Sequence, residues 1–180
     1  MKGQFSIALA LVFLFCCGTT VSAWEDISPE AAQQMILTNP DAYILDVRTV
    51  CEYKFVGHPF VPEGQIKNIP YWKFEFDRAA AEYIWIANVN DFFDAEVHRH
   101  FAPTDILIVV CKSGGRAGMA ADEIESPSQP ASQRLEDIGF TNVYRMIGGF
   151  SFGWEPADLP VSIGDEGIWK PSDFRGRSLK

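Results

Sequence analysis

One stretch decides the fold of this chain: residues 109–120 read VVCKSGGRAGMA, in which an apolar run ends at a cysteine. The run begins at Ile106 and contains no polar residue, as is typical of a strand buried inside a parallel sheet. Cys111 then stands at the carboxyl end of that strand, and residues 117–124 have the composition of a helix. The sequence therefore predicts a strand, a tight glycine-bearing loop and a helix, with the thiol where the strand ends.

The loop after the strand is suited to hold negative charge. Three small residues let backbone N–H groups turn inward, beside the positive end of the helix dipole. Two cationic side chains flank those small residues, and such surroundings favour the thiolate, which is the nucleophilic form of cysteine. We therefore expect Cys111 to be catalytic and the substrate to be bound by the loop residues Lys112, Ser113, Gly114, Gly115 and Arg116.

Residues 111–116 resemble the active-site loop of the rhodanese superfamily, which commonly reads Cys-Arg-Ser-Gly-x-Arg. Upstream, four further segments are similar to family blocks: Asp46-Val47-Arg48, Glu52-Tyr53, Gly57-His58 and residues 64–70, which read GQIKNIP. Downstream, the closing pattern of the family is matched by residues 139–144, which read GFTNVY, and by Gly148-Gly149 and Trp154. The blocks occur in the family's order between Ile27 and Val161.

This resemblance implies an α/β fold, a rhodanese-like three-layer architecture with a mostly parallel central sheet flanked by helices. It also implies a sulfurtransferase that needs no cofactor, in which the Cys111 thiolate takes the outer sulfur of a donor such as thiosulfate. The persulfide would then pass to cyanide, to a thiol or to a sulfur-accepting protein partner. Asp46, Arg48 and His58 are expected to support the site, and a catalytic role for them is the alternative.

Three other interpretations use nearly the same residues. Phosphatases and arsenate reductases of the superfamily have one more residue between the cysteine and the arginine than the four found here, which favours sulfur transfer. A non-catalytic sulfur carrier would hold the persulfide for a partner. A thiol–disulfide protein would use Cys51 as a redox partner of Cys111, although a bridge needs Cα atoms within about 7 Å, and we expect Cys51 to be an ordinary loop residue.

The first 23 residues have the three parts of a secretory signal peptide. Lys2 is followed by an apolar run at residues 7–17 and by the small-residue site Val21-Ser22-Ala23. The run is too short to span a hydrocarbon core of about 30 Å, and the residues before Cys16 and Cys17 suit a lipoprotein poorly. We therefore expect cleavage after Ala23 and a periplasmic or secreted protein without a membrane anchor.

The mature chain is expected to be one domain, at residues 24–162, followed by a tail at residues 163–180 that is rich in glycine, serine and charge. The net charge of −9 becomes −10 once Lys2 is removed, which argues against a nucleic acid partner. His98 and His100 have no cysteine or carboxylate at a ligand spacing, so no metal site is predicted. Surface acids of an exported protein serve mainly solubility.

Other elements follow from local patterns. Ser28 and Pro29 predict a helix start, and residues 43–47 and 140–146 predict two more strands. Residues 71–101 are rich in aromatic side chains and end in a predicted helix that begins at residue 91. We expect this segment to cover one face of the sheet and part of the pocket mouth. The alternative is an aromatic surface that binds a ligand. The helix predicted at residues 117–124 should be broken at residues 125–132, which contain two prolines, and should resume at residues 134–138. A further short helix is expected at residues 150–154.

Overall fold

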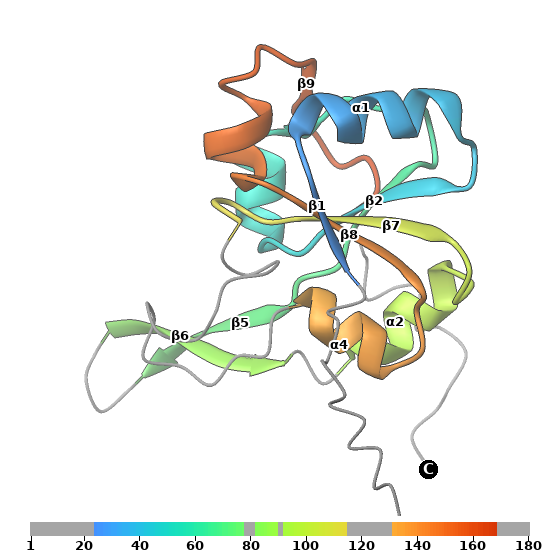
Figure 1. Ribbon diagram of the computed structural model, residues 1–180. Coiled ribbons are helices and arrows are strands. Elements are labelled where there is room, and N and C mark those ends of the chain that lie inside the picture. The colour runs from blue at the N-terminus through green and yellow to red at the C-terminus, as the bar shows by residue number, and fades with distance from the viewer. Residues whose placement is uncertain (1–23, 78–81, 90–91, 115–130, 169–180) are drawn as a thin grey trace, which may run out of the picture.

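The computed structural model describes residues 24–77, 82–89, 92–114 and 131–168 (Figure 1). Several expectations from the sequence lie outside these residues. They are the signal peptide, the loop residues Gly115 and Arg116, the helix at residues 117–124 and the end of the tail. In the described ranges no helix is both long and apolar enough to cross a membrane.

Five parallel strands form the main sheet, which confirms the predicted α/β class. The strand order is β1-β8-β7-β2-β4, so the strand before the cysteine, β7, lies in the middle. The strands are β1 (Glu25–Ile27), β2 (Ala42–Asp46), β4 (Ile66–Asn68), β7 (Ile106–Val110) and β8 (Asn142–Met146). Because all five run in the same direction, their carboxyl ends meet at one edge of the sheet, where β7 delivers Cys111.

The sheet is covered on both faces, as the three-layer prediction requires. Along β7 the side chains alternate: Leu107 and Val109 join one buried cluster, whereas Ile108 and Val110 join the other. The first cluster includes residues from α2 (Phe93–His100) and α4 (Ala131–Asp137), and the second includes residues from α1 (Pro29–Thr38) and the π-helical segment η2 (Gly149–Trp154). Figure 1 shows α1 on one side of the sheet and α2 with α4 on the other.

The start of α1 confirms the predicted cap. The Ser28 hydroxyl accepts a hydrogen bond of 3.2 Å from the Ala31 N–H, and Pro29 occupies the first turn, where no backbone donor is needed. Ala32 and Ile36 are buried on the helix face that meets the sheet. A serine, a proline and two apolar residues one turn apart are thus enough to set the start and the orientation of this helix.

Two short sheets lie beside the main one. The strands β3 (His58–Pro59) and β9 (Val161–Ser162) pair antiparallel, as do β5 (Trp72–Asp77) and β6 (Glu82–Val89). The aromatic segment therefore forms a hairpin that pairs with itself, and Figure 1 shows it projecting beside the main sheet. The expectation that residues 71–101 cover a sheet face holds for α2, whose Phe93 and Val97 are buried in the core.

The packed domain continues beyond the boundary expected at residue 162. The Asn68 N–H donates to the Gly167 carbonyl at 2.9 Å, and the Tyr53 hydroxyl donates to the Glu166 carbonyl. Ile168 packs against the second cluster and forms a parallel bridge with Asn68. Residues 163–168 therefore belong to the domain, because their backbone groups satisfy those of β4, and composition alone did not reveal this.

Candidate active site

Cys111 lies directly after the last residue of β7, as predicted, and is fully buried. The Gly114 N–H points back at it and donates to Sγ over 3.1 Å. Lys112 and Ser113 are exposed, whereas Gly114 is buried. The loop thus curls so that the sulfur lies inside it, within reach of a backbone donor.

The start of η2 holds the loop through two backbone hydrogen bonds. The Phe150 N–H donates to the Cys111 carbonyl at 2.7 Å, and the Ser151 N–H donates to the Lys112 carbonyl at 2.9 Å. No peptide bond in the described residues is cis, so each of these peptide units points its N–H away from its carbonyl. The N–H groups of Lys112 and Ser113 therefore face away from η2.

Gly149 is a site residue for which the sequence reasoning gave no role. Its φ is 58°, and a Cβ there would lie 2.3 Å from the Cys111 carbonyl oxygen and 2.8 Å from the Gly114 nitrogen. Real Cβ atoms do not approach that closely, so only glycine lets η2 lie against the loop. The signal was present in the Gly148-Gly149 pair, which had been used only as part of the family pattern.

Asp46 and Arg48 form a buried ion pair at the end of β2, where the sequence predicted site support. Arg48 Nη2 lies 2.6 Å from Asp46 Oδ2 and donates to the Gly57 carbonyl at 2.8 Å. The guanidinium also lies over the Phe150 ring, 4.4 Å from its centroid. Since the Phe150 N–H holds the Cys111 carbonyl, the geometry fits a structural role for this pair: it braces the segment that holds the loop.

Asn68, at the end of β4, completes this frame. Its Nδ2 donates to the Asp46 carbonyl at 3.0 Å and to the Arg48 carbonyl at 2.8 Å. The side chain thereby ties together two adjacent strand ends in the buried interior. In the sequence this asparagine stands only within the family-like segment at residues 64–70, and no role was predicted for it.

His58 lies apart from the cysteine loop. Its ring stacks on Tyr53 with centroids 3.9 Å apart, and Nδ1 lies 3.3 Å from the Tyr53 carbonyl oxygen. Burial lowers the pKa of His58 below its ordinary value, and the neighbouring Asp46 and Glu166 oppose that shift only partly. His58 lines a pocket whose lining includes none of the residues 111–114, and its ring contacts η1 (Glu52–Val56) through Tyr53 and the C-terminal segment through Glu166.

Both described cysteines are free thiols. Cys51 precedes η1 and is exposed, whereas Cys111 is buried. Within residues 24–77, 82–89, 92–114 and 131–168, no three histidine, cysteine or carboxylate side chains cluster as metal ligands would. The described part of the site presents a buried thiol whose sulfur accepts a hydrogen bond from the Gly114 N–H.

Comparisons with known sequences agree with this geometry. A family model described as "Rhodanese-like domain" matches residues 28–155. Thiosulfate sulfurtransferase 16, chloroplastic, of Arabidopsis thaliana is 35% identical over 117 residues, which cover 65% of this chain and 77% of that protein. An uncharacterized protein of Rickettsia conorii, RC0915, is 27% identical over 141 residues, which cover 76% of this chain and 95% of that protein.

Solved structures show the same fold. Rv0390 from M. tuberculosis matches with a TM-score of 0.55 and 24% identity, over 78% of this chain and 98% of that one. The polysulfide-sulfur transferase homodimer from Wolinella succinogenes matches with a TM-score of 0.52 and 20% identity, over 79% of this chain and 80% of that one. At such identities these structures support the architecture and leave the chemistry to be argued from the site.

Proposed function

Because this chain belongs to the rhodanese-like domain family, we propose that it is a sulfurtransferase that carries sulfane sulfur as a persulfide on Cys111. The observation that supports the proposal most directly is the hydrogen bond from the Gly114 N–H to Cys111 Sγ at the end of β7. A backbone donor aimed at sulfur stabilises the anion that attacks and the anion that results. The likeness to a plant thiosulfate sulfurtransferase supports thiosulfate as the donor to test.

The proposed reaction has two displacement steps. In the first, the Cys111 thiolate attacks the outer sulfur of thiosulfate, the S–S bond of the donor breaks, and sulfite leaves with the bonding electron pair. In the second, cyanide or a thiolate attacks the terminal sulfur of the persulfide. The bond between the two sulfurs breaks and its electrons return to Cys111 as the thiolate, so no external oxidant or reductant is required.

The loop would serve both steps with the same groups. The N–H groups of Lys112, Ser113 and Gly114 surround the place where the negative charge of the donor, and then of the persulfide, is located. Lys112 adds a mobile ammonium at the exposed rim, and we assign Arg116, from its position in the family loop, the forked contact to the oxyanion. Asp46 and Arg48 act through Phe150 and hold the loop in place.

The proposal extends to the cellular location of the reaction. The sequence pattern at residues 1–23 supports export with cleavage after Ala23, to the periplasm or the exterior. A small-molecule donor and a thiol or cyanide acceptor fit the single buried thiol of the site, and a sulfur-accepting protein is a further partner. Edman sequencing of the exported protein tests the cleavage site, because Trp24 should then be the first residue.

Mass spectrometry of the intact protein after incubation with thiosulfate tests the chemistry. We expect a gain of one sulfur atom that peptide mapping places on Cys111 and that cyanide removes as thiocyanate. In Cys111→Ser both the added mass and the release of sulfite should be lost, whereas Cys51→Ser, which keeps the loop intact, should behave as the wild type does. Sulfite release by Cys111→Ser would refute the proposal.

A further inference from the structure

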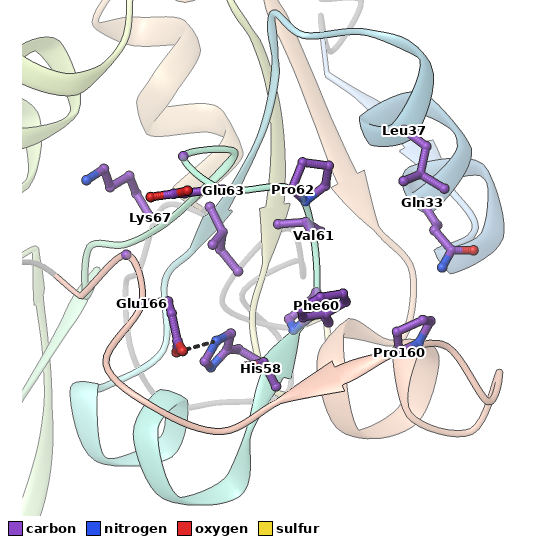
Figure 2. A pocket seen from close by; sticks show the side chains of 15 residues that line it. Gln33, Leu37, His58, Phe60, Val61, Pro62, Glu63, Lys67, Pro160 and Glu166 are labelled. Carbon is purple, nitrogen blue, oxygen red and sulfur yellow. Dashed lines mark ion pairs between the residues drawn. The ribbon is translucent and has the colours of Figure 1, made fainter.

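A pocket of about 770 Å³ lies at the β4 edge of the molecule, lined by residues of α1, β3, β4, β9 and the C-terminal segment (Figure 2). This volume lies within the range of about 300–1,000 Å³ that small-molecule sites occupy. The cysteine loop contributes none of its described residues to the lining. The pocket is therefore not explained by the proposed sulfur transfer, and its lining shows what it can hold.

The polar end of the pocket is formed by His58 and Glu166. The Tyr53 carbonyl can only accept, so the 3.3 Å contact to His58 Nδ1 is a hydrogen bond only if Nδ1 carries the proton. Because burial lowers the pKa of His58, the ring is neutral at pH 7 and above, and Nε2 then bears a lone pair. The side chain of His58 is 1% exposed, so the direction of this lone pair is fixed.

Nε2 of His58 lies 3.6 Å from Oε2 of Glu166 (Figure 2). With the proton on Nδ1, both atoms are acceptors. Lys67, a cation of the lining, extends away from the pair in Figure 2. A second carboxylate, Glu63, also lines the pocket, so its charged groups favour a positively charged occupant.

The rest of the lining is mainly apolar. Phe60 and Leu37 are large hydrophobic side chains that remain 62% and 61% exposed at the pocket, and they are joined by Val61, Pro62 and Pro160. Figure 2 places Leu37 and Pro160 on the side away from Glu166. An occupant with an apolar body and a cationic end would cover these apolar side chains and would also satisfy the two acceptors, His58 and Glu166.

We propose that this pocket binds a primary organic amine with an apolar body, whose ammonium donates to Nε2 of His58 and to the carboxylate of Glu166. An ammonium offers three donors and a full positive charge, which matches two converging acceptors, one of them ionised. A neutral or anionic molecule of the same shape satisfies this pair less well, and an anion is repelled by it. The specificity of the site therefore comes from charge, and its affinity comes from the apolar wall.

The backbone that carries Glu166 is held in place, although the Glu166 side chain itself is 65% exposed. Lys54 Nζ pairs with Asp165 at 2.6 Å, and the Tyr53 hydroxyl holds the carbonyl of Glu166 itself. The next residue, Gly167, lies so close to Ile66 that a Cβ would be 2.4 Å from the Ile66 carbonyl oxygen. Since the His58 ring is buried and the backbone on both sides of Glu166 is fixed, the ordering that an amine must impose is confined to the Glu166 side chain.

Titration calorimetry at pH 8 with 2-phenylethylamine tests the site on the full mature chain, because the probe is then cationic and His58 neutral. We expect saturable binding that is about tenfold weaker in Glu166→Gln, since a charge-assisted hydrogen bond is lost while the backbone contacts remain. His58→Leu removes the other acceptor and should weaken binding similarly. Glu155→Gln, an exposed carboxylate outside the lining, is the matched control.

Two uncharged or anionic analogues complete the test. We expect 2-phenylethanol and 3-phenylpropionate, which keep the aromatic body, to bind at least tenfold more weakly than the amine. Equal affinity of the alcohol and the amine would overturn the proposal, as would unchanged amine affinity in Glu166→Gln. Absence of amine binding, with a water bridging the acceptors instead, would overturn it as well. Thermal unfolding of each variant shows whether the fold is retained.

Discussion

Replacing Gly149 by alanine should disturb both the packing of η2 and the chemistry of the loop. The added Cβ would stand 2.3 Å from the Cys111 carbonyl oxygen, and this contact must open by about 0.7 Å merely to reach 3.0 Å. The φ of 58° adds a left-handed strain of about 1–2 kcal/mol, and forcing an extra carbon into a packed contact costs about 1–3 kcal/mol. We expect a loss of about 2–5 kcal/mol in the free energy of unfolding.

The effect on activity follows from the group that moves. The carbonyl in question belongs to Cys111 itself, so relief of the clash displaces the nucleophile from its backbone donors. A misplacement of about 1 Å at a reacting centre reduces rates roughly 100-fold, and we expect a loss of that order in kcat/KM for thiosulfate:cyanide sulfur transfer. Guanidinium unfolding and steady-state kinetics measure the two effects on the same preparation.

Gly139→Ala provides the matched control. Gly139 also has a positive φ, 102°, but a Cβ there meets nothing within 4 Å. The control therefore carries a conformational cost without the clash, and its kcat/KM should stay at the wild-type value. If the two variants lose the same stability and the same activity, contact with the Cys111 carbonyl is not the reason for glycine at position 149, and the argument is refuted.

Three further predictions concern charge and redox state. Arg48→Met leaves the Asp46 carboxylate buried without its cation and should lower the free energy of unfolding in urea by about 3–5 kcal/mol. Lys54→Met, which breaks an exposed ion pair, should lower it by less than about 1 kcal/mol. Equal losses would contradict the bracing role of Arg48. Because burial lowers the folded-state pKa of His58, the unfolded chain takes up the proton first as the pH falls. The free energy of unfolding should therefore be fully present above about pH 6.5 and should decrease as the pH drops toward the folded pKa. Unfolding of His58→Gln at several pH values should show a shallower decrease, and parallel curves would exclude His58 as the source of this pH dependence. Mature protein isolated without reductant should have lower sulfurtransferase activity, which reductant restores. Thiol counting under denaturation should then find fewer than two free thiols. Two free thiols together with full activity would leave Cys51 without a redox role.

The sheet and the cysteine loop were predictable because their signals are local. An uninterrupted apolar run identified β7, and Ser28 with Pro29 identified the start of α1. The position of Cys111 at a strand end followed directly from the first of these. The family resemblance then supplied the three-layer architecture with a mostly parallel sheet, whereas the order of the strands came only from the structure.

The interactions that support the site were harder to predict because they join residues distant in sequence. The closeness of Gly149 to the Cys111 carbonyl depends on how η2 returns to the sheet, and nothing in either segment alone specifies that distance. The hairpin of β5 and β6 was missed although residues 72–77, which read WKFEFD, alternate between aromatic and charged side chains as a strand does, because the segment was interpreted by its aromatic content alone. The docking of residues 163–168 depends on backbone bonds, which any polar sequence can make.

The pairing of β1 with β8 has a consequence for folding during synthesis. Asp26 and Arg145, which bond across these strands, are 119 residues apart, and Tyr53 and Glu166 are 113 apart. Such a high contact order means that a growing chain cannot complete its sheet until nearly all of it has left the ribosome, a delay of roughly 10 s at ordinary rates of synthesis. The strands β2, β4 and β7 all lie before residue 111 and can pair with one another earlier. It is therefore β1, together with the side of β7 that faces β8, that waits longest for a partner.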